Sequence, residues 1–115
     1  MTGDAYPKYS LPSGNWTTDL EHANRLWAKH AGWDSTTVID TDHGVYDALP
    51  ARDADDAPEG SVLTVMRDGG SLAGYVAGTE GQYVALLATE RGNRIAGVRA
   101  TLAGAASLVA DRDRG

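Results

Sequence analysis

The second half of the chain, residues 61–111, is a run of four short alternating segments that ends in a capped apolar helix. Glycine-containing turns separate the segments, at Asp68-Gly69, at residues 78–81 and at Gly92-Asn93. Asp-Gly and Gly-Asn pairs favour two-residue hairpin turns, because such turns need positive φ angles. Segments that alternate with period two and are joined by tight turns form antiparallel sheets. The run therefore predicts a four-stranded antiparallel sheet over about 61–100.

The turns also predict which side chains of this sheet share a face. With Asp68-Gly69 as the first turn, one set of apolar and small residues falls on a single face across all four strands. This set is Leu63, Val65, Leu72, Gly74, Val76, Tyr83, Ala85, Leu87, Ala96 and Val98. The opposite face would present Val62, Thr64, Met66, Ser71, Ala73, Tyr75, Ala77, Val84, Leu86, Ala88, Ile95, Gly97 and Arg99. We expect the first face to be buried. The second face is either covered by residues 1–17 or 33–50 or free as an interaction surface, and we call it the free face.

Two helices are predicted, one before this sheet in the sequence and one after it. Thr18 and Glu21 fit a capping box, and apolar residues follow at helical spacing, which predicts a helix over about 19–31. Its expected buried face is Leu20, Ala23, Leu26, Trp27 and Ala31, with Gly32 as its C-terminal cap. Thr101 is the predicted cap of a second helix over about 102–111, whose apolar stripe is Leu102, Ala105, Ala106 and Val109. Because this stripe is flat, we expect close packing on the sheet, with Gly74 leaving the necessary room.

The remaining segments give weaker signals. Residues 1–17 read as an irregular N-terminal arm, and residues 50–60 read as an acidic solvated loop. Between them, residues 36–39 favour a short strand, and residues 45–49 fit either a strand or a single helical turn. Together these elements predict a single α+β domain over 1–115, in two layers, with both helices on one face of the sheet.

Composition limits the classes of function. The chain has 115 residues and no cysteine, so disulfides and thiolate chemistry are excluded. It carries a net charge of −6, and the acidity lies in residues 1–60, where eleven Asp or Glu face four Lys or Arg. Residues 61–115 hold six Arg against five acids. An acidic chain is a poor general binder of phosphate backbones, although a local basic patch fits this distribution.

No segment has the length and hydrophobicity of a membrane span, and the N-terminus lacks the pattern of a signal peptide, so we expect a cytoplasmic protein. The excess of Arg over Lys and the abundance of Ala, Gly and Asp are typical of a GC-rich genome, such as that of an actinobacterium or its phage.

One segment resembles a ligand cluster for a metal ion. Residues 40–44, Asp-Thr-Asp-His-Gly, place two carboxylates and an imidazole close together. The segment fails as a calcium loop because Gly44 stands where a third ligand is required and Ala51 replaces the closing Glu. A polar turn is the favoured interpretation, and we expect no metal and no cofactor. Motifs for nucleophilic catalysis, phosphate cradling or zinc-dependent hydrolysis do not occur, so an enzyme is not expected.

Two interaction functions stay open. The leading hypothesis is a small adaptor or inhibitor-like domain that binds a protein through the free sheet face or the acidic loop. Its candidate contacts are Tyr75, Arg99, Met66, Asp53, Asp55 and Asp56. The alternative is weak local nucleic-acid binding, with bases stacked on a sheet that carries Tyr75, Arg67, Arg91, Arg94 and Arg99. The predicted order of elements resembles that of double-stranded RNA-binding domains, but residues 101–105 lack the basic cluster that begins their last helix.

The state of association is also open in the sequence. The strand that begins at Ser61 is protected at its start only by Pro58, so either a monomer or a homodimer through an edge strand fits the pattern.

Overall fold

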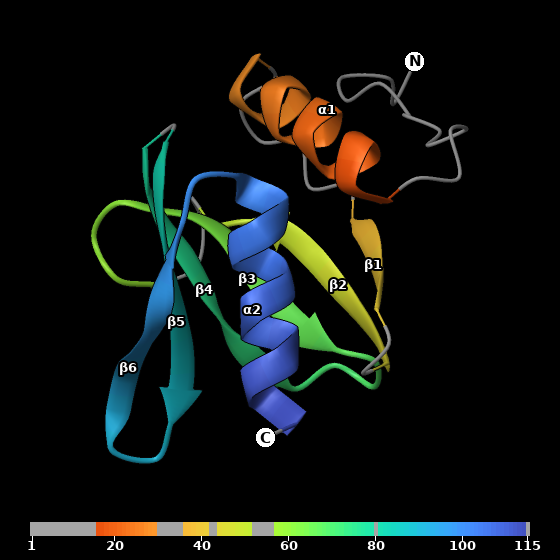
Figure 1. Ribbon diagram of the computed structural model, residues 1–115. Helices are drawn as coiled ribbons and strands as arrows, with labels where there is room; N and C mark the ends of the chain where they lie inside the picture. Colours follow the sequence, from red (N-terminus) through yellow and green to blue (C-terminus); the bar gives the residue numbers. More distant parts are fainter. Residues whose placement is uncertain (1–15, 30–35, 42–43, 52–56, 80, 115) are drawn as a thin grey trace, which may run out of the picture.

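The computed structural model describes residues 16–29, 36–41, 44–51, 57–79 and 81–114. The elements follow in the order α1 (Trp16–Lys29), β1 (Thr37–Thr41), β2 (Gly44–Pro50), β3 (Ser61–Arg67), β4 (Leu72–Thr79), β5 (Gln82–Thr89), β6 (Gly92–Arg99) and α2 (Leu102–Arg114). The fold is α+β, as expected, with two helices and one antiparallel sheet (Figure 1).

The sheet has six strands, so the expectation of four is wrong. Its order is β1-β2-β3-β4-β5-β6, and every strand pairs antiparallel with its neighbours in the sequence. The two added strands are the weak segments at the start of the sheet. In β1 and β2, buried residues alternate with exposed or half-buried ones, so that Ile39, Tyr46 and Ala48 face the core while Val38 and Asp40 face solvent. This period of two is the signature of half-buried strands, and it decides in favour of strand for residues 45–49.

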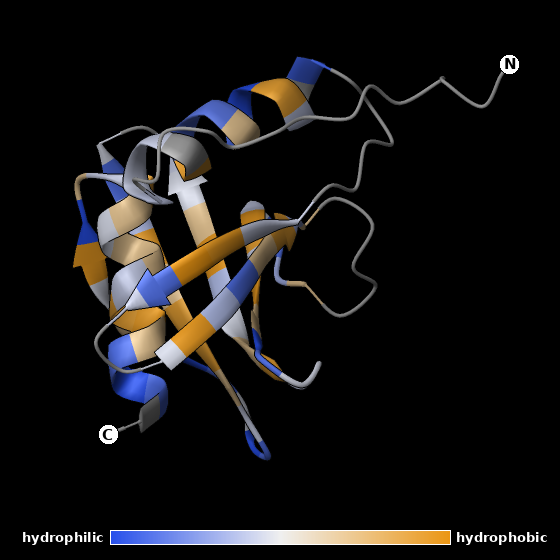
Figure 2. Cartoon of the chain, turned by 90° about the vertical axis from the view of Figure 1, so that its right-hand side faces the viewer, coloured by the Kyte–Doolittle hydropathy of each residue, from blue (hydrophilic) through white to orange (hydrophobic). Residues whose placement is uncertain are grey.

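Helix α2 packs on one face of the sheet and matches the prediction closely. Its backbone contacts β4, β5 and β6, and Figure 1 shows it lying across these strands. The cap is confirmed, because the amide of Gly104 donates to Oγ1 of Thr101 over 3.0 Å. All four residues of the expected stripe are fully buried, and Leu108 and Ala110 join them. The helix continues to Arg114, and its last turn is hydrophilic (Figure 2).

Gly74 provides the close approach that was expected. A methyl group at this position would lie 2.0 Å from the carbonyl oxygen of Leu86 and 3.0 Å from Cγ1 of Val109. Real Cβ atoms do not approach other atoms so closely, so only glycine fits between β5 and α2 here. We call the face of the sheet that packs on α2 the inner face and the opposite one the outer face.

Helix α1 begins three residues before its predicted start and ends at Lys29. Thr18 therefore lies in the first turn and is not the cap. Trp16 accounts for the earlier start: it stands one turn before Leu20 and extends the stripe that continues through Ala23 and Trp27, all packed on the core. Ala31 and Gly32 lie outside the described residues. Helix α1 packs on β1 and touches α2, and the placement of both helices on one face stays a prediction.

The hairpin turns differ from the predicted ones. Residues 68–71 connect β3 to β4, and the amide of Arg67 donates to the carbonyl of Ser71 over 2.7 Å, which encloses a turn of residues 68–70. Gly69 and Gly70 both have positive φ in this turn, which is one residue longer than expected. A bulge next to it restores the alternation, so Leu63 and Val65 still share the inner face with Gly74 and Val76. The β5–β6 turn lies at Glu90-Arg91, two residues before the predicted one.

Candidate protein-binding surface

The last strand of the sheet, β6, is its free edge. Among the described residues β6 pairs only with β5, while β1 forms the opposite edge. An edge strand presents backbone N–H and C=O groups that have no strand partner on one side. The chemistry of β6 therefore depends on which side chains line each face of this edge.

A bulge in β6 determines which of its side chains lie on the inner face and which on the outer face. Ala85 of β5 pairs with Gly97 and Leu86 pairs with Ile95, which leaves Ala96 as an extra residue. In a regular strand Arg94 and Arg99, five residues apart, would lie on opposite faces, and so would Ile95 and Val98. The bulge places both arginines on the inner face and both apolar side chains on the outer face. Val98 was expected to be buried and Gly97 to be free, and the bulge reverses both expectations.

The apolar side chains form an outer row along the edge. Ile95, opposite Leu86, is 66% exposed, and Val98, opposite Val84, is 52% exposed. Val84 and Leu86 are themselves only half-buried. The outer row, defined as Ile95 and Val98, thus continues an apolar surface of β5 and ends at the free edge.

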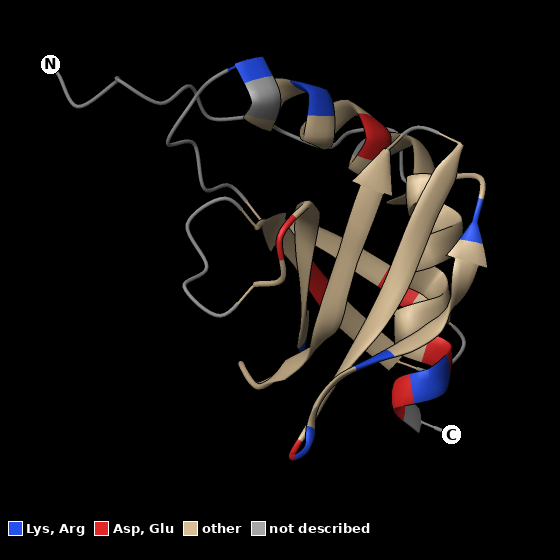
Figure 3. Ribbon diagram, turned by 90° about the vertical axis from the view of Figure 1, so that its left-hand side faces the viewer, with Lys and Arg blue, Asp and Glu red and all other residues tan. Residues whose placement is uncertain are grey.

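The arginines form an inner row on the same edge. Arg94 lies opposite Leu87 and Arg99 lies opposite Tyr83, both of which pack on the core. The stem of Arg99 runs over the first turn of α2, since a methyl group at Gly104 would lie 3.4 Å from its Cβ. Nη1 of Arg99 donates to the carbonyl oxygen of Val98 over 2.8 Å. Both side chains are exposed. Figure 3 shows basic residues along β6 and both signs of charge at the tip of the β5–β6 hairpin.

Gly97 explains how the inner row can lie so close to α2. A Cβ atom at this position would be 2.8 Å from Cδ2 of Leu108 and 3.4 Å from Nη1 of Arg99. The absence of a side chain lets Leu108 pack against the strand between the two arginines. Helix α2 thereby supports the edge strand β6, while the guanidinium groups of the inner row reach solvent.

Comparison of the chain with protein-family models, with curated proteins and with solved structures finds no match of any of the three kinds. Assignment of a function consequently depends on the residues themselves.

Tyr75 and Arg99, which both hypotheses placed in one site, are not brought together. Tyr75 pairs with Thr64 and Leu86 on the outer face, whereas Arg99 belongs to the inner row. Tyr75 is only 3% exposed, and Ala73 and Thr64 beside it are also buried. The outer face is thus closed to solvent at Tyr75, Thr64 and Ala73 and open at Ile95 and Val98 of β6. Buried Tyr75 offers no ring surface for stacking.

The other predicted site residues are scattered. Met66 is half-buried in β3, and Arg91 lies at the tip of the β5–β6 hairpin. Asp53, Asp55 and Asp56 lie outside the described residues. Arg94 is exposed in the inner row, while Arg67 lies at the far end of β3 and is engaged by a carboxylate. The five residues proposed for nucleic-acid binding therefore do not form a platform with Tyr75 at its centre.

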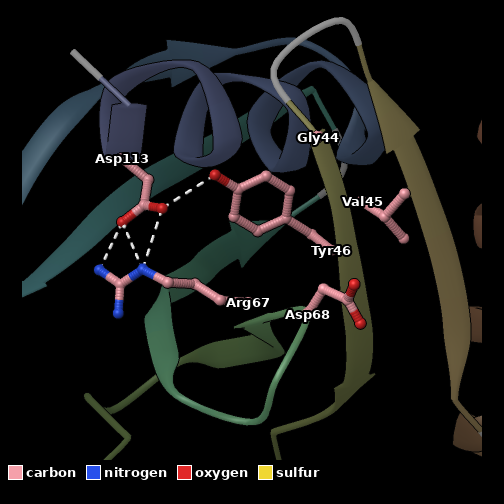
Figure 4. A pocket seen from close by; sticks show the side chains of 6 residues that line it. All are labelled: Gly44, Val45, Tyr46, Arg67, Asp68 and Asp113. Carbon is pink, nitrogen blue, oxygen red and sulfur yellow. Dashed lines mark hydrogen bonds and ion pairs between the residues drawn. The ribbon is translucent and has the colours of Figure 1, made fainter.

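Arg67 lines a polar cavity of about 590 Å³ with Gly44, Val45, Tyr46, Asp68 and Asp113. Figure 4 shows Arg67 and Tyr46 converging on Asp113. Nε of Arg67 lies 3.0 Å from both carboxylate oxygens, and the Tyr46 hydroxyl donates to Oδ2 over 2.8 Å. The hydrogen bond to Asp113 raises the pKa of Arg67, against the opposing effect of desolvation. Nη1 also donates to the carbonyl of Leu72 over 2.9 Å, so the donors of this guanidinium are largely occupied by the protein.

This three-residue network was missed in the sequence. Arg67 and Asp113 are 46 positions apart, and Tyr46 and Asp113 are 67 apart. One sequence signal could have indicated this network. Asp113 lies at the C-terminal end of a helix, where the macrodipole disfavours a negative charge, so a compensating partner is expected.

The segment at residues 40–44 contributes a turn. Oγ1 of Thr41 donates to the carbonyl oxygen of Gly44 over 2.9 Å, which supports the β1–β2 hairpin. Asp40 is exposed on the outer face, and Asp42 and His43 lie outside the described residues. Among the residues that the structure describes, no three His, Asp or Glu side chains gather in a way that could hold a metal ion. None of the described helices combines the length and hydrophobicity needed to cross a membrane.

Proposed function

We propose that this chain is a small non-enzymatic protein-interaction domain, adaptor-like or inhibitor-like, that binds its partner through the edge strand β6. The observation that carries the proposal is the outer row: two branched apolar side chains, Ile95 and Val98, lie exposed beside each other on a free sheet edge. The proposed contact site therefore differs from the predicted one: it lies on β6, at the open part of the outer face, and no longer includes Tyr75 of β4.

Physical reasoning favours contact at this row. Burying apolar surface is the main favourable term in most protein association. Ile95 and Val98 are 66% and 52% exposed, and covering each of them would contribute about 1 to 2 kcal/mol. The unpaired backbone of the edge adds directional hydrogen bonds that two isolated surface residues would lack. An exposed apolar edge is otherwise a liability for aggregation, which gives a reason to expect a partner there.

Affinity purification from the native host, after nuclease treatment, tests this proposal. Wild-type protein is compared with Ile95→Asp and with Val38→Asp, a matched change at the other edge, where Val38 is 50% exposed. We expect a stoichiometric protein to be recovered with wild type and with Val38→Asp and to be lost with Ile95→Asp. Retention of the same protein by Ile95→Asp contradicts the proposed surface, and a complex that disappears with nuclease supports the nucleic-acid alternative.

A further inference from the structure

We infer that β6 binds an extended acidic peptide segment of the partner as an added strand, with apolar side chains on the outer row and carboxylates on the inner row. This inference rests on the proposed function, because it names the kind of partner that the same edge accepts. The inference depends on the bulge at Ala96, because this bulge places the basic side chains of β6 on the inner face and its apolar side chains on the outer face.

The backbone supplies the first part of the argument. β6 has eight residues, and its side facing away from β5 has no strand partner among the described residues. A peptide that pairs with such an edge alternates its side chains between the two faces, so it meets one face with every second residue. An edge that is apolar on one face and basic on the other therefore selects a peptide with alternating apolar and acidic residues.

Charge supplies the second part. Arg94 and Arg99 are exposed, and neither forms an ion pair with an acidic group in the described part of the chain. Arg91 at the hairpin tip adds a third positive charge, and Glu90 is the acidic residue of the same hairpin. This local excess of positive charge contrasts with the net charge of −6 on the whole chain. Complementary charge at the rim of an interface favours acidic partners and raises their association rate.

The same arrangement disfavours a second copy of the chain. Antiparallel pairing of two β6 strands about a two-fold axis would bring Arg94 and Arg99 of both copies into one row, and like charges opposite each other destabilise a sheet. The bulge also twists the edge, which hinders pairing with a second rigid sheet more than pairing with a flexible peptide. Nucleic acid is disfavoured because the outer row offers apolar side chains and no exposed ring.

Titration with defined peptides tests the inference. A labelled, blocked octapeptide of alternating Val and Glu is added to the full chain, and binding is followed by fluorescence anisotropy. A matched peptide with Lys in place of Glu is the control ligand. The variant Arg94→Glu/Arg99→Glu is compared with Arg25→Glu/Lys29→Glu, which makes the same charge change on exposed positions of α1.

We expect wild type and the α1 variant to bind the Val-Glu peptide and the β6 variant to bind it at least about tenfold more weakly while gaining affinity for the Val-Lys peptide. Slowed amide exchange confined to β6 would support strand addition. Absence of Val-Glu binding, equal loss in both variants, a stable β6-mediated dimer in sedimentation or preferential binding of a single-stranded oligonucleotide would each overturn the inference.

The purification experiment separates the two proposals. If the native partner is lost with Ile95→Asp but kept by Arg94→Glu/Arg99→Glu, the proposed function stands and the acidic-peptide inference fails. If Ile95→Asp keeps the partner, the binding surface lies elsewhere and both fail.

Discussion

Arg67 and Asp113 join the third strand of the sheet to the last turn of the C-terminal helix. The side chain of Asp113 is only 7% exposed, whereas that of Arg67 is 43% exposed, so the pair has one buried and one open end. Tyr46 completes the network from β2 and is itself buried. The interaction thus holds the helix end against two strands that lie distant from it in the sequence.

Replacement of Asp113 by Asn should weaken the fold by about 1 to 3 kcal/mol. The substitution removes charge-assisted hydrogen bonds from Arg67 and leaves the Tyr46 hydroxyl with a poorer partner in a mostly buried site. Urea unfolding followed by circular dichroism measures the change. Glu90→Gln, at an exposed position in the β5–β6 hairpin, should change stability by less than about 0.5 kcal/mol. Equal effects of the two substitutions would mean that the network contributes nothing specific.

The pH dependence of stability should distinguish Arg67 from a lysine. Its pKa is raised, so its contribution is complete below the ordinary pKa of arginine and is lost only as the pH rises through the still higher folded value. Arg67→Lys places at the site a group that deprotonates at about pH 10. We therefore expect the difference in unfolding free energy between wild type and Arg67→Lys to stay nearly constant from neutral pH to about pH 10 and to grow as the pH rises above that value. A difference that does not grow between about pH 10 and pH 11 would contradict the expectation.

Alanine at Gly74 should be more harmful than alanine at Gly97. At Gly74 the added methyl group meets a backbone oxygen that cannot move alone, whereas at Gly97 it meets the end of the Leu108 side chain, which can change rotamer. We expect a loss of about 3 kcal/mol or more for Gly74→Ala and about 1 kcal/mol for Gly97→Ala. Thermal and urea unfolding measure both, and the reverse order would show that the pairing of β4 with β5 adapts to an added methyl group more easily than the packing of α2 on β6 does.

Deletion of Ala96 should be tolerated, because the shortened strand would alternate regularly and keep Arg94 and Arg99 on the inner face. We expect a folded protein that has lost about 1 to 2 kcal/mol, since Ala96 also packs partly on the core. Deletion of Val84 from the neighbouring strand has no bulge to absorb it and should disrupt the sheet. Circular dichroism and amide exchange report on both deletions, and unfolding by the Ala96 deletion would show that the bulge is required for the fold itself.

The parts of the fold that local chemistry determines could be predicted. The cap at Thr101, the buried stripe of α2 and the close approach at Gly74 follow from residues within a few positions or from the need for a small side chain. Strands β1 and β2 were ambiguous because each is short and carries acids on the outer face, so propensity alone could not add them to the sheet.

The candidate site depended on features that a pattern of alternation does not contain. A bulge inserts one residue without any marker in the sequence, and that single residue moved Arg99 away from Tyr75 and exposed Val98. The partners of Arg67 came from a helix end and a strand that were expected to have no relation to it. Long-range pairing of this kind is set by how the layers meet and not by local spacing.

The neighbour-to-neighbour order of the sheet also bears on how the molecule folds. Every strand pairing closes a loop between consecutive segments, so the entropy of loop closure stays small and hairpins can form one after another. Helix α2 comes last in this sequence of events, because its apolar stripe has a surface to bury only after β4, β5 and β6 have paired. Strand β6 is then held on one side by β5 and on its inner face by α2, so the backbone groups on its outward side can exchange their hydrogen bonds while the rest of the sheet stays intact.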